Sequence, residues 1–308
     1  MADAAAGLSH QALAYRGSAE CLAPVLSFVR GGLTAGEAVS VGVGEPVARV
    51  LREALPDPEP RVAITDITEL GRNPGRIIAA MTDYASRNPQ RPVRFVSEPF
   101  WAARSEAEVV EATRHEALLN RAFAGAPVTT LCLYDADALD PAVLKTAQQT
   151  HPVIVADGQA MLSPAYASPE VIPPECERAL PPPPAGASFL AYADDLRPVR
   201  ALVARHAALA GLAAGRASDL VLAVSEVAAN TLRHAGGQGT LHVWHTPDEI
   251  FCQLRDQGHI TDPLVGRRRA AGLGGHGLWL VHQVCDLVQL RTGPSGTALR
   301  LRMLRQAR

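Results

Sequence analysis

The sequence predicts an α/β protein with two domains: an N-terminal domain built on a mostly parallel sheet with helices on both faces, and a C-terminal two-layer α/β sandwich. Three observations support this prediction. The chain has 308 residues, 47% of them hydrophobic, which is enough for two separate cores. Strand-like and helix-like segments alternate in its first half. A proline-rich stretch then precedes a region in which the hydrophobic period changes.

The first half contains five apolar segments with the length and composition of strands. They cover residues 38–44, 61–67, 93–98, 129–135 and 152–157. Helical patterns lie between them at residues 46–55, 75–87 and 105–124. Because strands alternate with helices, the predicted sheet is mostly parallel and covered on both faces.

A glycine-containing segment, VGVGEP at residues 41–46, lies between a predicted strand and a predicted helix, where a phosphate-binding loop would be found. A working Walker loop also needs a lysine at its end. Lys145 is the only lysine in the chain, and it follows LDPAVL rather than a glycine loop. We therefore exclude a Walker site and expect these glycines to serve tight turns.

Three other residues of this half are candidates for a role in binding. Phe100 and Trp101 follow a predicted strand, and His115 lies in the last long helix of this half. We expect the aromatic residues to pack in the core at the end of the strand, and His115 to be a surface or capping residue. Ligand binding is the alternative for all three.

Prolines accumulate between the two halves, in residues 166–187. They remove backbone donors and favour an extended, semi-rigid chain, so this segment is predicted to be a linker. A polyproline ligand for a partner domain is the alternative. The two domains are accordingly expected at residues 8–165 and 188–308.

Beyond the linker, two helical segments are predicted at residues 194–214, starting at an aspartate that can cap the helix, and at residues 218–235. Two strand patterns follow, GTLHVWHTP and EIFCQLRD, and then a basic, glycine-rich loop, a short helix at GLWLVHQVC and a final hairpin. This order predicts helices on one face of a mixed sheet.

Four short motifs of this domain contain the candidate site residues. Glu226 and Asn230 are four positions apart on a predicted helix, so they share one stripe of it. Asp256 and Gly258 follow a predicted strand, and Thr297 lies in the final hairpin. An asparagine oxygen suits Mg²⁺, an aspartate at a strand end can accept from the adenine amino group, and a glycine lets the backbone approach the base.

The remaining motif, GLGGHGL, places three glycines before the short helix. Glycines leave amide groups bare at a helix N-terminus, where the helix dipole favours phosphate. Glu226 lies one turn before Asn230 and can take the proton from an attacking hydroxyl or water. We therefore predict an ATP and Mg²⁺ site with Glu226 as catalytic base and Asn230 as metal ligand. The predicted cofactor-binding residues are Asn230, His234, Asp256, Gly258, Gly272, Gly274, His276, Gly277, Leu278 and Thr297.

Composition excludes several other classes. The formal net charge of −2 leaves no excess of positive charge for a phosphate backbone, so no direct nucleic-acid partner is expected. No apolar run is long enough to span a membrane and the first residues do not form a signal peptide, so we expect a cytoplasmic protein without a membrane partner. The five cysteines are far apart and form no CxxC pair, which predicts buried core residues rather than disulfides or a zinc site.

Several segments of the first half resemble the MEDS domain, a DcmR-type sensory module. They are HQALAYRG, GEAVSVGVGEP, ELGRNPGRII, SEPFWAARS, RHEALLNRAF and LCLYDADALD. The resemblance implies a RecA-like sheet with a degenerate phosphate loop, and a sensory role for an unknown small ligand.

The four motifs of the second half, in their order, resemble the GHKL (HATPase) superfamily, which includes gyrase, histidine kinases and the RsbW and SpoIIAB anti-sigma factors. This resemblance implies the Bergerat fold and bound ATP and Mg²⁺. It assigns Asn230 as the magnesium ligand, Glu226 as the base, Asp256 as the adenine-binding residue and residues 272–277 as the phosphate lid.

The compact domain, the NTLRHAG ending of its second helix and the short lid are most similar to the anti-sigma serine kinases, as in RsbA-family regulators. This resemblance implies a serine/threonine kinase whose partners are a sigma factor and/or a STAS-type anti-anti-sigma protein, with a homodimer as one implied assembly. Two alternatives stay open: a histidine kinase-like sensor with His115 or His206 as acceptor, and a non-catalytic module that retains the ATPase fold.

The sequence departs from the family pattern at one motif. The expected DxGxG is replaced by Asp256-Gln257-Gly258-His259-Ile260, so the second glycine is absent and His259 is expected to narrow the pocket. ATP binding is therefore a firmer expectation than kinase activity. Three arginines before the lid are either within reach of a γ-phosphate or a solvated charge run; they are Arg267, Arg268 and Arg269.

Overall fold

The computed structural model divides the chain into two compact units, residues 1–176 and 177–308, and each is described by itself. The described residues are 7–55, 62–156, 158–269 and 275–305. Among the helices within these ranges, none combines the length and apolar character that crossing a membrane requires.

The N-terminal unit is built on a seven-stranded sheet with the order β3-β2-β4-β5-β1-β6-β7. Its strands are β1 (Ser9–Tyr15), β2 (Ala38–Val43), β3 (Val62–Asp66), β4 (Val93–Ser97), β5 (Val128–Asp135), β6 (Val153–Ala156) and β7 (Gln159–Leu162). All neighbours are parallel except β7, which is antiparallel to β6. The predicted parallel sheet and strands β2 to β6 are confirmed. Two strands were not predicted from the sequence: β1, which lies between β5 and β6, and the edge strand β7.

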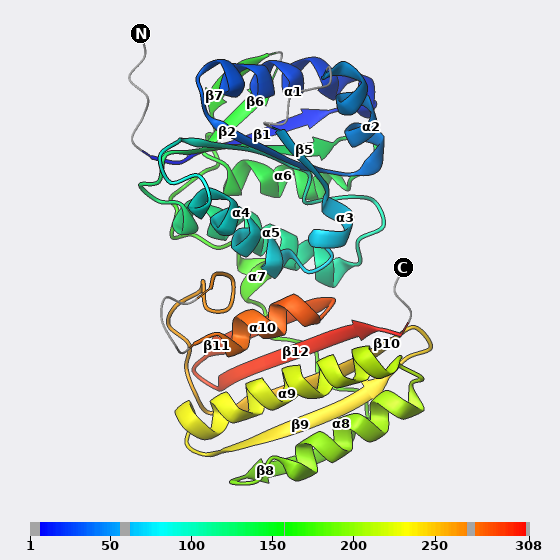
Figure 1. Ribbon diagram of the computed structural model, residues 1–308. Coiled ribbons are helices and arrows are strands. Elements are labelled where there is room, and N and C mark those ends of the chain that lie inside the picture. The colour runs from blue at the N-terminus through cyan, green and yellow to red at the C-terminus, as the bar shows by residue number, and fades with distance from the viewer. Residues whose placement is uncertain (1–6, 56–61, 157, 270–274, 306–308) are drawn as a thin grey trace. The chain divides into compact units, whose positions relative to one another are not determined.

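Helices cover both faces of this sheet (Figure 1). The helices before the unit boundary are α1 (Gly17–Thr34), α2 (Glu45–Ala54), α3 (Ile67–Leu70), α4 (Ile77–Ser86), α5 (Glu106–Ala122) and α6 (Pro141–Thr150), with the 3-10 turn η1 (Pro74–Arg76) before α4. A short helix, α7 (Pro174–Glu177), lies at the boundary of the two units. On one face, α1 and α2 pack on the strands through a core that includes Val25, Val41 and Leu51. The other face carries α4, α5 and α6. A capping box begins α5, where the Ser105 amide donates to Glu108 Oε2 at 2.7 Å.

Burial in this unit agrees with some expectations and corrects one. Phe100 is 3% exposed and stacks on Tyr134, as expected for a core residue. All five cysteines are buried, as predicted. His115, however, is 0% exposed, so the surface position expected for it is wrong. The reason is that every residue of α5 from Glu111 to Asn120 is buried, so this part of the helix is covered on all sides. The helical period of the sequence instead predicts a helix with one exposed face.

The C-terminal unit has a five-stranded sheet with the order β11-β12-β10-β9-β8. The strands are β8 (Ser188–Ala193), β9 (Gln238–His245), β10 (Glu249–Asp256), β11 (Leu287–Gly293) and β12 (Gly296–Leu304). Every pair is antiparallel, so the predicted mixed sheet is wrong in this respect. Two of the pairs are hairpins, and β8, which the sequence analysis does not predict, adds an antiparallel edge.

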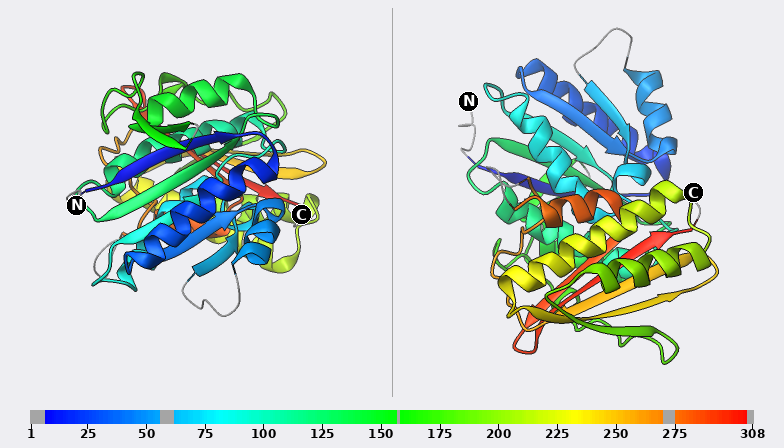
Figure 2. Two further views of the ribbon diagram at one scale, coloured as in Figure 1. Left: turned by 90° about the horizontal axis from the view of Figure 1, so that it is seen from above. Right: turned by 60° about the horizontal axis from the view of Figure 1, so that its bottom comes forward.

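Three helices pack on one face of this sheet (Figure 2) and complete the predicted two-layer sandwich. They are α8 (Arg197–Leu209), α9 (Ala214–His234) and α10 (Gly277–Val284). Helix α9 starts at Ala214 rather than at the predicted Ser218. At the start of α8 the carboxylate of Asp195 accepts the Arg197 amide at 2.9 Å.

Candidate functional site

A cavity of about 480 Å³ lies in the C-terminal unit between α9, the end of β10 and the start of α10. Every predicted site residue that the structure describes lines it: Glu226, Asn230, His234, Asp256, Gly258, His276, Gly277, Leu278 and Thr297. Gly272 and Gly274 lie outside the described residues. Four motifs separated by up to 71 positions are thus brought to one cavity, since Glu226 and Thr297 are its first and last predicted members.

The α9 side of the cavity carries the two residues predicted to act on the phosphates. Glu226 and Asn230 lie one turn apart on the helix, and both are partly exposed. A Cβ on Gly277 would lie only 2.6 Å from Glu226 Oε2 and 3.7 Å from Asn230 Nδ2. A side chain at position 277 would therefore collide with Glu226, so glycine is needed for the start of α10 to approach this carboxylate so closely. Arg233 Nη2 donates to Asn230 Oδ1 at 3.1 Å.

Asp256 is fixed at the opposite end of the cavity by two hydrogen bonds. Its Oδ2 accepts from the Thr231 hydroxyl at 2.7 Å, and its Oδ1 accepts from the Gly258 amide at 2.9 Å. The hydroxyl of Tyr192 donates to Thr231 Oγ1 at 3.1 Å. Burial, together with the Asp256 carboxylate, raises the pKa of Tyr192, which keeps this hydroxyl a donor.

Thr231 and Tyr192 are therefore supporting residues that the sequence analysis misses. Thr231 is 1% exposed and lies among the apolar residues of α9 that face the core. A hydroxyl in an otherwise apolar stripe was the available signal, because a buried polar group needs a partner. For Tyr192 there was no signal, since its strand β8 was not predicted.

The closing hairpin holds the same end of the cavity. The Thr297 hydroxyl donates to the Gly258 carbonyl at 2.8 Å and lies 3.0 Å from Thr292 Oγ1. It is therefore already engaged in positioning the loop after β10. Gly258 itself packs closely, because a Cβ there would lie 2.7 Å from Ala235 Cβ.

The residues that replace the second glycine of the motif lie at the rim. His259 is exposed, and its Nδ1 lies 3.2 Å from Thr292 Oγ1, so the ring is turned toward the hairpin while it lines the cavity. Ile260 adds an apolar side chain to the cavity wall, and its amide donates to the same threonine at 3.1 Å.

The three arginines before the lid do not line the cavity. Arg267 is 4% exposed. Burial lowers the pKa of His282 to about 3, and the positive charge of Arg267 contributes to this shift. Arg268 pairs with Asp262 at 3.7 Å, and the guanidinium of Arg269 lies 5.3 Å from the Trp279 ring.

In the N-terminal unit, a carboxylate fills the place of a phosphate loop. Glu98 Oε2 accepts from the Gly44 amide at the N-terminus of α2, at 2.8 Å, and Oε1 accepts from the Tyr15 hydroxyl at 2.6 Å. Burial raises the pKa of Glu98. Gly44 has a φ of −67°, so it does not serve the tight turn that was expected; a Cβ there would lie 3.3 Å from Glu98 Oε2.

Comparison with known families agrees with this division. Residues 9–152 match the model of the MEDS domain, described as the methanogen/methylotroph, DcmR sensory domain. Residues 189–303 match the model of the histidine kinase-like ATPase domain, which implies nucleotide binding in the C-terminal unit. No curated protein matches the chain. The chain therefore contains a MEDS sensory domain followed by a histidine kinase-like ATPase domain, the combination of a regulatory, kinase-like protein.

Proposed function

We propose that this protein is an anti-sigma-type regulator whose C-terminal domain binds Mg-ATP, sequesters a sigma factor and phosphorylates a STAS-type anti-anti-sigma protein on serine or threonine. The observation that carries the proposal is the convergence of nine predicted residues on one cavity in a domain of the histidine kinase-like ATPase family. The MEDS domain would supply the signal that controls this activity.

The cavity fits a magnesium-bound nucleotide triphosphate. Glu226 and Asn230 lie beside Gly277, at the N-terminus of α10, where amide groups favour phosphate. Asn230 offers the neutral oxygen that Mg²⁺ accepts as a ligand, and binding requires the exposed Arg233 to turn away from that oxygen. Asp256, held by Thr231, is positioned to accept from the adenine amino group.

In the proposed reaction, Glu226 removes the proton from a serine or threonine hydroxyl of the partner. That oxygen bonds to the γ-phosphorus as the bond between this phosphorus and the β,γ-bridging oxygen breaks, so ADP leaves and the partner keeps the phosphate. The magnesium ion would neutralise charge on the phosphate oxygens.

Burial of the two candidate acceptor histidines argues for this reaction rather than for autophosphorylation. His115 is 0% exposed. His206 is 8% exposed, and its Nε2 lies 2.9 Å from Ser188 Oγ. A histidine that receives phosphate from ATP must reach the nucleotide, and neither side chain is free to do so without rearrangement of its surroundings.

The decisive experiment is phosphate transfer from γ-labelled Mg-ATP to candidate STAS-type proteins, with the untagged full chain. We expect Glu226→Gln to lower the transfer rate by about 10²- to 10⁴-fold while nucleotide affinity changes little. Asp219→Asn, on the same helix but outside the cavity, is the matched control and should transfer at the parental rate. Label that appears on this chain in acid-labile form would instead indicate a histidine kinase.

A non-catalytic nucleotide-binding module is the second candidate. It is favoured by the three arginines, which are not among the residues that line the cavity, and by Ile260 in place of a glycine. It predicts Mg-dependent ATP binding that is lost in Asn230→Ala, capture of a sigma factor, and no transfer from either the parent or Glu226→Gln.

A further inference from the structure

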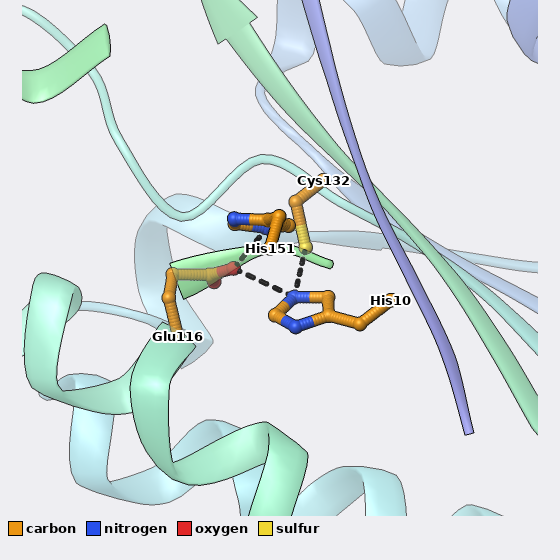
Figure 3. Close-up of side chains that lie close together, drawn as sticks. All are labelled: His10, Glu116, Cys132 and His151. Carbon is orange, nitrogen blue, oxygen red and sulfur yellow. Dashed lines mark hydrogen bonds and ion pairs between the residues drawn. The ribbon is translucent and has the colours of Figure 1, made fainter. Parts of the chain in front are cut away.

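Four ionisable side chains meet in the interior of the N-terminal unit: His10, Glu116, Cys132 and His151 (Figure 3). One ligand-type atom from each lies within 4.8 Å of all the others. The four residues are between 0% and 1% exposed. The cluster belongs to no part of the nucleotide site, which lies in the other unit.

The fold explains why residues so distant in sequence come together. On neighbouring parallel strands, His10 pairs in register with Thr130 and Ala12 with Cys132, so His10 and Cys132 point to the same face of the sheet. Glu116 comes from α5, which covers that face, and His151 follows the end of α6.

Hydrogen bonds fix which nitrogen of each histidine carries a proton. Asn120 Nδ2 donates to the backbone carbonyls of Thr150, Ala117 and Glu116, so its Oδ1 is the acceptor that faces His10 Nδ1 at 3.1 Å. His151 Nδ1 lies 2.9 Å from the Ala147 carbonyl, which can only accept. Both histidines therefore carry their proton on Nδ1.

Their Nε2 atoms then point lone pairs at the Glu116 carboxylate. The distances to Glu116 Oε2 are 3.1 Å from His10 and 2.9 Å from His151, and His10 Nε2 also lies 3.5 Å from Cys132 Sγ. A carboxylate is an acceptor only, so neutral imidazoles would place lone pair against lone pair at hydrogen-bond distance. A metal cation or additional protons between these atoms would relieve this repulsion.

Two further protons on the histidines could supply that charge, but the geometry is unfavourable. The two rings lie only 3.8 Å apart between centroids, so two imidazolium ions would repel each other in a dry interior. Within the described part of the chain, Glu116 has ion pairs to histidines and none to arginine or lysine. A divalent cation with one carboxylate, one thiolate and two neutral imidazoles leaves no net charge.

We propose that His10, Glu116, Cys132 and His151 form a four-coordinate binding site for a borderline divalent transition-metal ion, with Zn²⁺ as the best fit. Zinc distances of about 2.0–2.2 Å to nitrogen or oxygen and about 2.3 Å to sulfur, in a tetrahedron, separate ligand atoms by roughly 3.3 to 3.6 Å. The three spacings of 2.9, 3.1 and 3.5 Å are close to these values and need a small expansion, and all six lie within 4.8 Å, so any pair longer than 3.6 Å must close by about 1.2 Å at most.

The two histidines have the outer hydrogen-bond partners that metal-binding histidines usually have. Asn120 and the Ala147 carbonyl orient the two rings from outside, which is the usual second layer of a histidine–zinc site. The Thr130 hydroxyl lies 3.8 Å from Cys132 Sγ. The hydroxyl of Tyr134, which is 2% exposed, has no hydrogen-bond partner among the described atoms, and its ring lies edge-on to His151.

Because four protein ligands fill the tetrahedron and all are buried, the site has no open coordination position for a substrate. It resembles structural zinc sites rather than catalytic ones. The ion would tie together β1, β5, α5 and the end of α6, and Cys132 would lose its thiol proton on binding. The sensory domain would then be stable, and able to signal, in its metal-bound form.

The test is zinc binding to the untagged full chain under reducing conditions and without nucleotide. Binding is measured by competition with a chromophoric chelator and by metal analysis after gel filtration. We expect one zinc ion per chain, and a loss of affinity in Cys132→Ser greater than the roughly 10- to 100-fold that an outer partner costs. Cys21→Ser is the matched control, because Cys21 is also 0% exposed in the same unit but is not part of the cluster.

Substitution by Co²⁺ gives a second, spectroscopic measurement that reports which atoms bind the ion. The parent and Cys21→Ser should show a thiolate-to-cobalt charge-transfer band and intense tetrahedral bands, and Cys132→Ser should lack the former. Retained ATP binding in the C-terminal unit will show that Cys132→Ser is folded there. The proposal is overturned if the parent binds no zinc, or if Cys132→Ser and Cys21→Ser bind it equally.

Discussion

The C-terminal unit contains an open polar site, whereas the polar cluster of the N-terminal unit is buried. In the C-terminal unit, the residues line a cavity of about 480 Å³, and all of the predicted ones except the buried Thr297 remain at least partly exposed. In the N-terminal unit, four polar groups lie within 4.8 Å of each other and are almost completely buried. The first arrangement leaves room for a ligand as large as a nucleotide. The second leaves room only for an ion.

The helix N-termini of the two units show the same contrast. At α10 the first residue of the helix, Gly277, lines the cavity beside the Glu226 carboxylate. At α2 the corresponding amide of Gly44 is already occupied by the Glu98 carboxylate. The Glu98 carboxylate interacts with the positive end of the α2 dipole, so a phosphate could bind there only by displacing this side chain.

The largest expected effect is the protection that each ligand gives to its own unit. It is measured by adding each ligand separately and recording where amide hydrogen exchange slows. Zinc should protect strands β1 and β5 with α5, and Mg-ATP should protect α9 and the loop after β10. At about 100 times the dissociation constant, each ligand should stabilise its own unit by about 2.7 kcal/mol.

Variants assign these two effects. Cys132→Ser should remove only the zinc effect, and Asn230→Ala should remove only the Mg-ATP effect. Protection of the same segments by both ligands would contradict the assignment of one site to each unit.

Gly277→Ala should sharpen the description of the open site. The new methyl group would lie 2.6 Å from Glu226 Oε2, which can move because it is the end of a flexible side chain. We therefore expect the domain to remain folded while phosphate transfer falls by roughly 10- to 100-fold, because the carboxylate is displaced. Gly215→Ala, in the first turn of α9, has nothing within 4 Å and serves as control in the same assay. Equal rates for the two variants would argue against a catalytic position for Glu226.

Thr231→Val should show how much the support of Asp256 contributes. It removes the hydroxyl that donates to the carboxylate at 2.7 Å and accepts from Tyr192 at 3.1 Å. We expect a loss of about 1–3 kcal/mol in the free energy of unfolding of this unit, with weaker ATP binding. Tyr192→Phe removes only the second bond and should cost less, about 0.5–1.5 kcal/mol. Urea denaturation and calorimetric titration measure both effects, and a larger loss for Tyr192→Phe would contradict this order.

The smallest effect concerns the filled helix N-terminus of the N-terminal unit. Because burial raises the pKa of Glu98 in the folded state, the unfolded chain loses this proton first as the pH rises above the usual carboxyl pKa of about 4.3. Glu98 therefore contributes stability at low pH that is lost as the pH rises through its folded-state pKa. Glu98→Gln should remove this decline, whereas Glu53→Gln, an exposed site on α2, should keep it. Urea midpoints measured across this pH range provide the check.

Much of the fold was predictable because it rests on local patterns. Alternating apolar segments gave strands β2 to β6, and the long amphipathic segments gave α5, α8 and α9. The cavity was also predictable, since each of its motifs is a short run with a recognisable order. What remained out of reach was the support of those motifs by residues such as Tyr192, which lies on an unpredicted strand.

The buried cluster of the N-terminal unit was not predictable in this way. Its four members are far apart in the sequence and follow no regular spacing. Because the cysteines form no CxxC pair, the sequence predicted no zinc site. Only the parallel register of β1 and β5 brings His10 next to Cys132. The burial of His115 has a similar origin, because it depends on how many elements cover α5 rather than on the sequence of α5 itself.

The central position of β1 also has a consequence for how this domain is made. The strand comes first along the chain but pairs on both sides with much later segments, Ser9 with Thr129 and Gln11 with Val153. Contacts between such distant segments form slowly, because a long loop must close before they contribute. During synthesis the first strand must therefore wait for almost the whole domain to leave the ribosome. Until then it is an unpaired strand, available to wrong partners.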